Sequence, residues 1–380
     1  MPLATLAPAT APTLLSTQEQ IGYDLGWDHA HRALDLPAPC LTEPTSLRAG
    51  WLAGRAVFGP RTLPPSRAVR MWLQLRLHAW LHGRSVELFQ VTPHYLRQLE
   101  AGHCPIARVA FRDDSILDGD AVFSRVRSDA AYAAGNLALL SAKANYASPH
   151  AAWRDALRVA QQLDAGLQSG VCGLNANQWS RLAVLRSFVE PMPHEQACEL
   201  PMWVLPPNRL RLFNPAQALQ ALVSRQLLVA GWSLRISRIE ALVPGKAARH
   251  TFQMFFHALL PRVLEAGRNI SAHELRWAIE DAWRHPLVLQ RWSTFARQLS
   301  AIQCEALVLR AHAKRLGHGA AHEVNASLAT EGWNLESGGN LAPGGSRCRS
   351  PGRARGSAAR TSPDFALPAV PSRQTVLPLH

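Results

Sequence analysis

Paired cysteines are missing from this sequence. Its six cysteines are scattered, and no two of them form a C-x-x-C pair. A disulfide framework and a four-cysteine zinc site both depend on paired spacing, so the sequence predicts neither. The cysteine pattern is typical of a protein of the reducing cytoplasm, and we expect no structural zinc.

Long apolar runs are missing as well. The first residues, MPLATLAPATAPTLLS, contain no positively charged region, and no apolar run approaches the roughly 18 residues that a membrane span needs. We therefore expect a protein that is neither secreted nor inserted in a membrane, and that has no membrane partner.

Several catalytic motifs do not occur. The chain lacks G-x-x-x-x-G-K-[ST], a G-x-G-x-x-G after a strand, G-x-S-x-G and H-E-x-x-H. Hydrolysis by a P-loop, dinucleotide redox chemistry, and serine or zinc hydrolase activity are therefore unsupported, and we expect no nucleotide cofactor.

Lysine is scarce, although the chain is strongly basic. The net charge is +13, from 40 basic and 27 acidic residues, yet Lys143, Lys246 and Lys314 are the only lysines. This charge suits a polyanion such as nucleic acid. GC-rich coding would produce the same arginine excess, so the charge alone does not establish DNA as the partner.

The apolar content is sufficient for a large folded body. Of 380 residues 47% are hydrophobic, and most apolar periodicity is helical. We expect a mainly α protein with a small embedded α+β module. The expected divisions are a disordered leader at 1–18, a helical region at 19–100, the module at 101–149, a helical domain at 150–316 and a disordered Gly/Ser/Arg/Pro-rich tail at 317–380.

Apolar spacing and capping residues locate the individual elements. A short strand is expected at 86–91, in the mainly apolar sequence Val-Glu-Leu-Phe-Gln-Val. Helices are expected at 66–81, 92–99, 151–167, 177–189, 215–230, 251–266, 271–285 and 289–316.

One stretch, residues 123–145, carries a pattern with chemical content. It begins as a short strand, continues as a turn-rich loop to Gly135 and Asn136, and ends in a helix that carries Asn145. A strand, a loop and a helix can bring residues from two elements onto one cation, as a small phosphodiesterase site requires. The alternative interpretation is a loop cap at Asn136 and an ordinary polar helix residue at Asn145.

This stretch resembles the HNH endonuclease family, in the phage and bacterial subgroup with Asp-Arg-Ile, Gly-Tyr-x-Pro-Gly-Asn and Ser-x-x-Ala-Asn segments. Cys104-Pro105 precedes the pattern, and Tyr132 falls on the family tyrosine. Ser124-Arg125-Val126, Gly135-Asn136-Leu137 and Ala144-Asn145 match the remaining steps without gaps. The resemblance covers residues 103–148 and implies a ββα-metal fold.

The resemblance also implies roles for individual residues. It implies a divalent cation, usually Mg²⁺, that stabilises charge on the scissile phosphate. Asn136 would position the site loop, and Asn145 would be a ligand on the metal side. Arg125 would clamp phosphate, since arginine cannot act as a base at neutral pH. Arg127 and Lys143 are further expected contacts to nucleic acid.

Ser124 departs from the family pattern, because the family has its metal-binding aspartate there. A serine hydroxyl is a weak neutral ligand for a hard cation that prefers carboxylate oxygen. The nearby carboxylates of Asp118, Asp120 and Asp129 match no motif position. Ser141 and Ala144 fall where many members carry one pair of zinc-binding cysteines.

Two functional hypotheses follow. The first is a metal-dependent DNA endonuclease of HNH type, or a degenerate derivative of one, from a mobile element or phage. The second is a non-catalytic protein that keeps the module for DNA binding or as a structural element.

Overall fold

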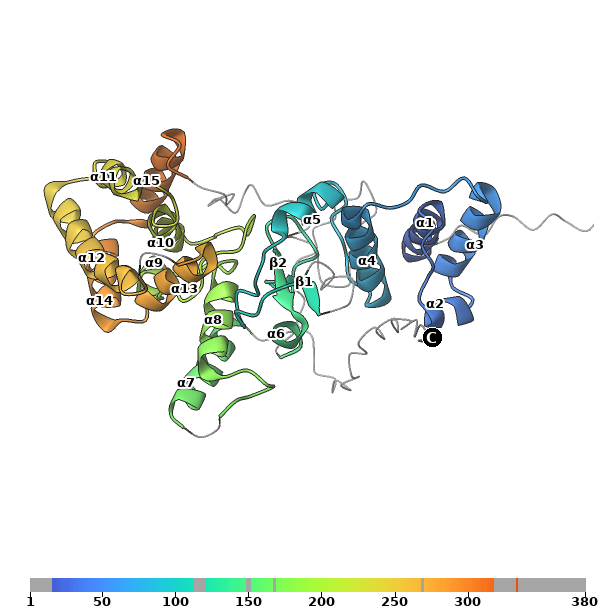
Figure 1. The fold of residues 1–380 in the computed structure, drawn as a ribbon, viewed down its shortest axis with the longest axis horizontal. Coiled ribbons are helices and arrows are strands. Elements are labelled where there is room, and N and C mark those ends of the chain that lie inside the picture. The colour runs from blue at the N-terminus through green and yellow to red at the C-terminus, as the bar shows by residue number, and fades with distance from the viewer. Residues whose placement is uncertain are drawn as a thin grey trace, which may run out of the picture. The chain divides into compact units, whose positions relative to one another are not determined.

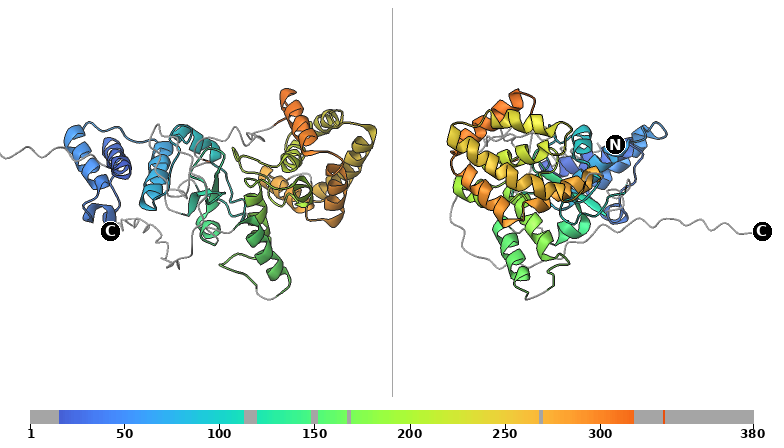
Figure 2. Two further views of the ribbon diagram at one scale, coloured as in Figure 1. Left: turned by 180° about the vertical axis from the view of Figure 1, so that it is seen from behind. Right: turned by 60° about the vertical axis from the view of Figure 1, so that its left-hand side comes forward.

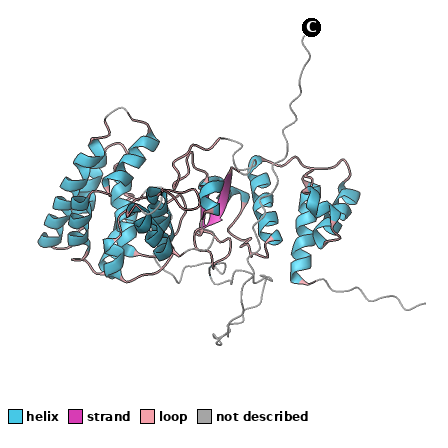
Figure 3. Ribbon diagram, turned by 90° about the horizontal axis from the view of Figure 1, so that it is seen from below, coloured by secondary structure: helices cyan, strands magenta, loops and turns pink. Residues whose placement is uncertain are grey.

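The computed structural model describes residues 16–112, 120–147, 152–166, 169–267, 270–317 and 333. The chain divides into two compact units after Ser85. Among these residues, the regular elements of the first unit are helices, and the second unit combines a pair of strands with helices (Figures 1 and 3). Among the described residues, no helix combines the length and the apolar character that crossing a membrane requires.

Two helices of the first unit pack at very close range. Glycines repeat every four residues on α1 (Thr17–His31) and on α3 (Ser46–Phe58). A Cβ atom at Gly26 would collide with Leu47 O, and one at Gly50 would collide with Tyr23 O. Small residues at this spacing let two helix backbones approach each other. Helix α1 begins inside the expected leader, because Ser16 and Glu19 form a capping box.

Helix α4 (Arg67–Leu81) completes the first unit, together with the short α2 (Ala38–Thr42). The prediction of a helix at 66–81 is confirmed, with Ser66 as its N-cap. Arg76 is buried, lies over the Trp72 ring and donates to Asp28 at 2.7 Å. This ion pair ties α4 to α1.

The second unit begins with the module expected at 101–149. Strands β1 (Ala121–Arg125) and β2 (Leu137–Ser141) pair antiparallel, with Ser124 opposite Ala138. Helix α6 (Ala142–Tyr146) follows directly and packs on both strands. A two-strand hairpin followed by a helix is therefore present, as the family resemblance implied, whereas the residue pattern alone had indicated only the first strand and the helix (Figure 3).

Residues 86–100 belong with this module. Helix α5 (Pro93–Leu99) begins after Thr92, as predicted. The predicted strand at 86–91 is wrong, because only Val86 forms a bridge, to Tyr132. The Glu87 carboxylate instead accepts from Ala134 N at 3.1 Å, so this segment supports the loop between β1 and β2 from outside.

A helical domain occupies the rest of the second unit, and Figure 2 shows it from two further sides. Its core is an aromatic cluster in which Phe255, Trp283, Trp292 and Phe295 contact one another edge to face or tilted. The helices are α7 (Trp153–Asp164), α8 (Ala176–Ser187), α9 (His194–Glu199), α10 (Pro215–Gln226), α11 (Trp232–Glu240), α12 (Lys246–Leu264), α13 (Ala272–Ala282), α14 (Pro286–Ala296) and α15 (Ala301–Ala313).

The domain differs from the sequence expectation at three places. The helix expected at 289–316 is two helices, α14 and α15, because Ser300 and Gln303 form a capping box that starts a new one. Helix α12 begins at Lys246, five residues before the predicted start. Helices α9 and α11 were not expected, since both are short.

A buried carboxylate joins the module to the helical domain. Glu280 on α13 is 1% exposed and accepts from Leu205 N at 2.9 Å. Arg276 donates to it at 3.2 Å, and so does Arg108 from the turn after α5. Burial raises the pKa of Glu280, and the nearby Arg276 partly offsets that rise.

Buried arginines bind backbone carbonyls in the same region. Arg181 donates to Ile106 O at 2.9 Å, and Arg225 donates to Pro206 O. Burial lowers the pKa of Arg181 and Arg186 to about 10, and that of Arg225 to about 9. These guanidinium groups remain charged at neutral pH and connect segments that have no ladder of backbone hydrogen bonds.

One residue of the expected tail belongs to the folded body. Residues 318–332 and 334–380 lie outside the described residues, but Trp333 is 6% exposed. Its Nε1 donates to Ala134 O at 2.9 Å, and its ring meets Phe213 edge to face. The expectation of a tail that is free from 317 onward is therefore wrong at this residue.

We expect Trp333→Ala to destabilise the second unit by about 3 to 5 kcal/mol, because it empties an aromatic site and leaves Ala134 O unpaired. Chemical unfolding measures the stability, and amide exchange at 134–136 should become faster. Trp333→Phe keeps the ring contact and should cost only about 1 kcal/mol. Unchanged stability and exchange in Trp333→Ala would contradict this burial.

Candidate functional site

Asn136 closes the loop between the two strands. Its side chain is fully buried, and Oδ1 accepts from Arg127 N at 2.8 Å. Nδ2 donates to Arg127 O and to Ala131 O, each at 3.0 Å. All of these partners are backbone groups of the loop, so Asn136 fixes the loop's shape from inside. This agrees with the positioning role that the family resemblance implies.

Arg125 is also engaged within the loop. Its Nη1 donates to Ser128 O at 2.8 Å and to Ala130 O at 3.0 Å. The guanidinium lies over the Tyr132 ring at 5.2 Å. Arg125 therefore holds the loop, and a role as a phosphate clamp would require it to exchange these carbonyls for phosphate oxygens.

Gly135 is enclosed on one side. Its φ of +85° is a left-handed conformation that glycine adopts freely. A Cβ there would lie 2.9 Å from the Arg211 Cβ, while Arg211 N donates to Gly135 O at 2.9 Å. Tyr95 completes the enclosure, since its hydroxyl accepts from Gly135 N at 2.7 Å.

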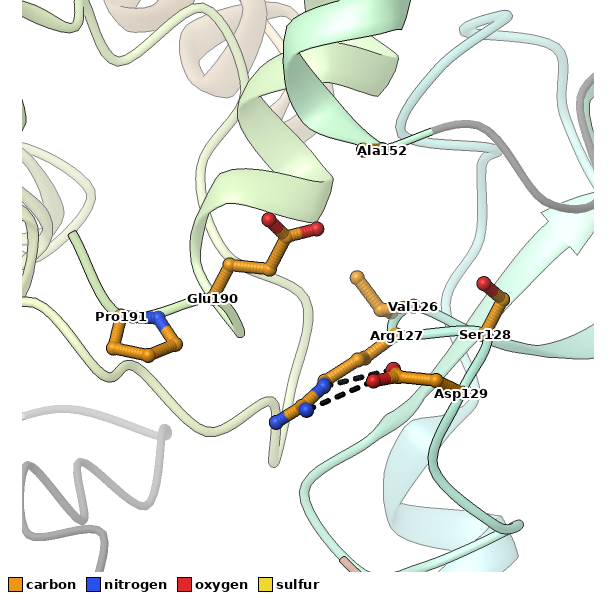
Figure 4. A pocket seen from close by; sticks show the side chains of 7 residues that line it. All are labelled: Val126, Arg127, Ser128, Asp129, Ala152, Glu190 and Pro191. Atoms are coloured by element: carbon orange, nitrogen blue, oxygen red, sulfur yellow. Dashed lines mark hydrogen bonds and ion pairs between the residues drawn. The ribbon is translucent and has the colours of Figure 1, made fainter. Parts of the chain in front are cut away.

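A cavity of about 320 Å³ opens beside this loop, lined by residues 126–129, Ala152, Glu190 and Pro191. Arg127 and Asp129 form a two-point ion pair in it, with Nε to Oδ1 at 2.8 Å and Nη2 to Oδ2 at 2.9 Å (Figure 4). Glu190 enters from the segment after α8. The cavity therefore holds two carboxylates and one guanidinium.

The charged groups of the cavity influence one another. The hydrogen bond from Arg127 lowers the pKa of Asp129, and the same bond raises the pKa of Arg127. Burial raises the pKa of Glu190, and Arg127 opposes that rise. Asp129 is thus held as a carboxylate by its arginine.

The remaining predicted site residues lie on β1 and α6. Ser124 is half-buried, and its Oγ donates to Arg125 O at 3.4 Å. Asn145 is half-buried on α6, and no described residue forms a hydrogen bond with its side chain. Lys143 is exposed, and its aliphatic chain lies over Gly173. The elements are adjacent, but no hydrogen bond joins Ser124 to Asn145.

The donor atoms on β1 and α6 do not suit a tightly held Mg²⁺. Ser124 and Asn145 offer neutral oxygens, whereas hard cations prefer carboxylates. The carboxylate of Asp129 forms an ion pair with Arg127, and that of Asp120 forms one with Arg112 at 2.7 Å. Asp118 lies outside the described residues. Within the part of the chain that the structure describes, no three His, Cys, Asp or Glu residues form a metal-binding group.

Cys104 occupies a junction that the sequence did not reveal. Its buried Sγ accepts from Ala107 N at 3.4 Å and from Ser141 N at 3.3 Å. Ser141 also caps α6, because its Oγ accepts from Ala144 N at 3.4 Å. The Cys104 sulfur therefore links Ala107 to Ser141 at the end of β2. The x-x spacing of Cys104 with Ala107 repeats that of Ser141 with Ala144, but the first pair contains only one cysteine.

Comparisons with known proteins give no further identification. No family model, no curated protein and no solved structure matches this chain. The resemblance to the HNH family therefore depends on the residues of the module.

We expect Asn136→Ala to lower the free energy of unfolding by about 2 to 4 kcal/mol, since it leaves three loop backbone groups without a partner in buried surroundings. Urea unfolding at fixed temperature measures this. Asn145→Ala is the matched control, because no described residue forms a hydrogen bond with its side chain, and it should change stability by less than about 0.5 kcal/mol. Equal effects of the two substitutions would contradict the loop-closing role.

Proposed function

We propose that residues 103–147 form an HNH-like module that binds DNA and derives from a metal-dependent endonuclease whose cation site is impaired. The observation that carries this proposal is the closed loop between β1 and β2. Asn136 joins the loop ends from within, and α6 follows directly with Asn145. If Asn136 were only a loop cap, there would be no reason for the motif positions from Ser124 to Asn145 to match the family spacing without gaps.

The junction at Cys104 supports the same proposal. The family resemblance places one cysteine pair at Ser141 and Ala144, and the other pair would then lie at Cys104 and Ala107. One backbone N–H of each pair, that of Ala107 and that of Ser141, donates to the Cys104 sulfur. This contact brings the two pairs close together, as a shared zinc site would require.

The donor set argues against efficient cleavage. Without a carboxylate at position 124, the module lacks the charge that would hold a cation against phosphate. Arg125 supplies no base. The binding of DNA by the basic protein is therefore the function that these residues support best, and cleavage is the second candidate because the scaffold of the site is kept.

We expect the full chain to retard duplex DNA without nicking supercoiled plasmid in Mg²⁺ or Mn²⁺. Ser124→Asp should introduce metal-dependent nicking, because it supplies the missing carboxylate. Plasmid relaxation on agarose gels measures both proteins. Ser124→Asn is the matched control of similar size and no charge, and it should remain inactive.

Three outcomes would count against parts of this proposal. Nicking by the parent that Asn136→Ala abolishes would establish an active endonuclease and overturn the impaired site. Absence of nicking in Ser124→Asp, with the fold intact, would overturn the nuclease derivation. Absence of DNA binding by the parent would overturn the function itself.

A second expectation concerns Cys104. The combined variant Ala107→Cys, Ser141→Cys and Ala144→Cys should bind one Zn²⁺ or Co²⁺ per chain, because four thiolates at x-x spacing make a tetrahedral site. Cobalt absorption and metal content after purification with Zn²⁺ measure this. The control variant carries Ala107→Ser and Ala144→Ser in place of the new cysteines at these two positions, and it should bind neither Zn²⁺ nor Co²⁺. A folded cysteine variant without metal would contradict the proposed relationship of the two pairs.

A further inference from the structure

Helix α11 meets the end of α15 through one arginine. Arg235 donates from Nη2 to Leu316 O at 3.1 Å and to Arg315 O at 3.3 Å, and from Nε to Gln226 Oε1 at 2.8 Å. The two helices lie beside each other in the helical domain (Figure 1). The guanidinium therefore fixes the C-terminal turn of α15 against α11.

Positive charge gathers at this junction. We call the set Arg235, Arg238, Arg310, Lys314 and Arg315 the α11/α15 basic surface. All but Arg235 are exposed. Among the described residues, no carboxylate forms an ion pair with Arg238, Arg310, Lys314 or Arg315. The acids of the two helices are Glu240 and Glu305, and Glu240 accepts from Gln253 at 2.7 Å.

Helix capping does not account for this charge. Cations at a helix C-terminus are favourable by about 0.3 to 1 kcal/mol, chiefly through the last carbonyl groups. At the end of α15, backbone N–H groups already bond to the carbonyls of Arg310, Ala311 and His312. Arg235 bonds to the carbonyls of Arg315 and Leu316, just beyond the helix end. Among the described residues, the side chains of Lys314 and Arg315 donate to no helix carbonyl, so these two cations add repulsion between like charges without capping α15.

We propose that the α11/α15 basic surface binds the sugar-phosphate backbone of duplex DNA. This inference rests on the proposed function of the module and adds a second contact region, in a domain that the motifs left without a role. Arginine forks match phosphate oxygens in two-point contacts, and each neutralised phosphate releases counterions. Such contacts give affinity without sequence preference.

An acidic protein is the other class of partner that this charge could suit. Leu234 and Leu309 are 60% and 55% exposed beside the surface, and a protein partner would bury them. A phosphate backbone would contact the cations alone. An acidic protein partner would therefore depend on Leu234 and Leu309 as well as on the cations, whereas DNA would depend on the cations only.

The test uses the full chain and a duplex of about 20 base pairs in fluorescence anisotropy at several salt concentrations. Arg238→Glu with Lys314→Glu should weaken binding at least roughly tenfold at moderate salt, and should reduce the slope of log K against log salt by about 1 per residue. Arg262→Glu is the matched control, since Arg262 lies on α12 and already pairs with Glu265 at 2.6 Å. It should change affinity less than twofold.

The outcomes separate this inference from the function of the module. Unchanged affinity and salt slope in the double variant, with the parent still binding, overturn the surface alone. Absence of binding by the parent overturns both. Leu234→Ser with Leu309→Ser should leave DNA affinity unchanged, and a loss equal to that of the charge variant would overturn recognition through phosphate.

Discussion

The second unit depends on the carboxylate of Glu280, which is almost completely buried. Because water cannot reach it, this carboxylate needs hydrogen-bond donors from the protein, and three chain segments supply them. Arg108 comes from the turn before the hairpin, Leu205 from the segment between α9 and α10, and Arg276 from the same helix as Glu280. Removal of the carboxylate would leave Leu205 N and Arg276 without this acceptor, whereas Arg108 would keep its two bonds to the neighbouring Asp281. The module and the helical domain are therefore joined by charged contacts at this part of α13.

The loop of the module is rigid for a related reason. Asn136, Arg125 and Glu87 all bind backbone groups of the loop, from inside or from outside, and Trp333 covers its end. These side chains hold the chain in place. Under the proposed derivation, a serine at position 124 would leave the fold undisturbed, because the Ser124 hydroxyl bonds only to the carbonyl of the neighbouring Arg125 and takes no part in closing the loop.

The sequence predicted the parts of this structure that depend on local pattern. The helices after Ser66 and Thr92, the first strand of the hairpin and the helix that carries Asn145 have capping residues or apolar spacing that can be read directly. The second strand came only from the family resemblance. The close approach of α1 and α3, the burial of Trp333 and the bond from Ser141 N to Cys104 depend on contacts between distant segments. The sequence around a buried arginine does not indicate which backbone carbonyl the arginine will bind. The segment 86–91 has the apolar content of a short strand, but its only bridge to another segment is the one from Val86 to Tyr132.

The buried arginines give a structural reason for part of the excess of arginine over lysine. Coding bias alone would place arginine and lysine interchangeably, yet the buried Arg181 and Arg225 and the half-buried Arg235 each reach a backbone carbonyl through a planar group that lysine does not have. A relative from a genome rich in lysine codons would have to retain arginine at these positions while its surface changed freely. These three residues, together with Glu280, are therefore a better guide for finding distant relatives than the motif residues. Residues that hold the fold together are still required in a protein whose catalytic residues have changed.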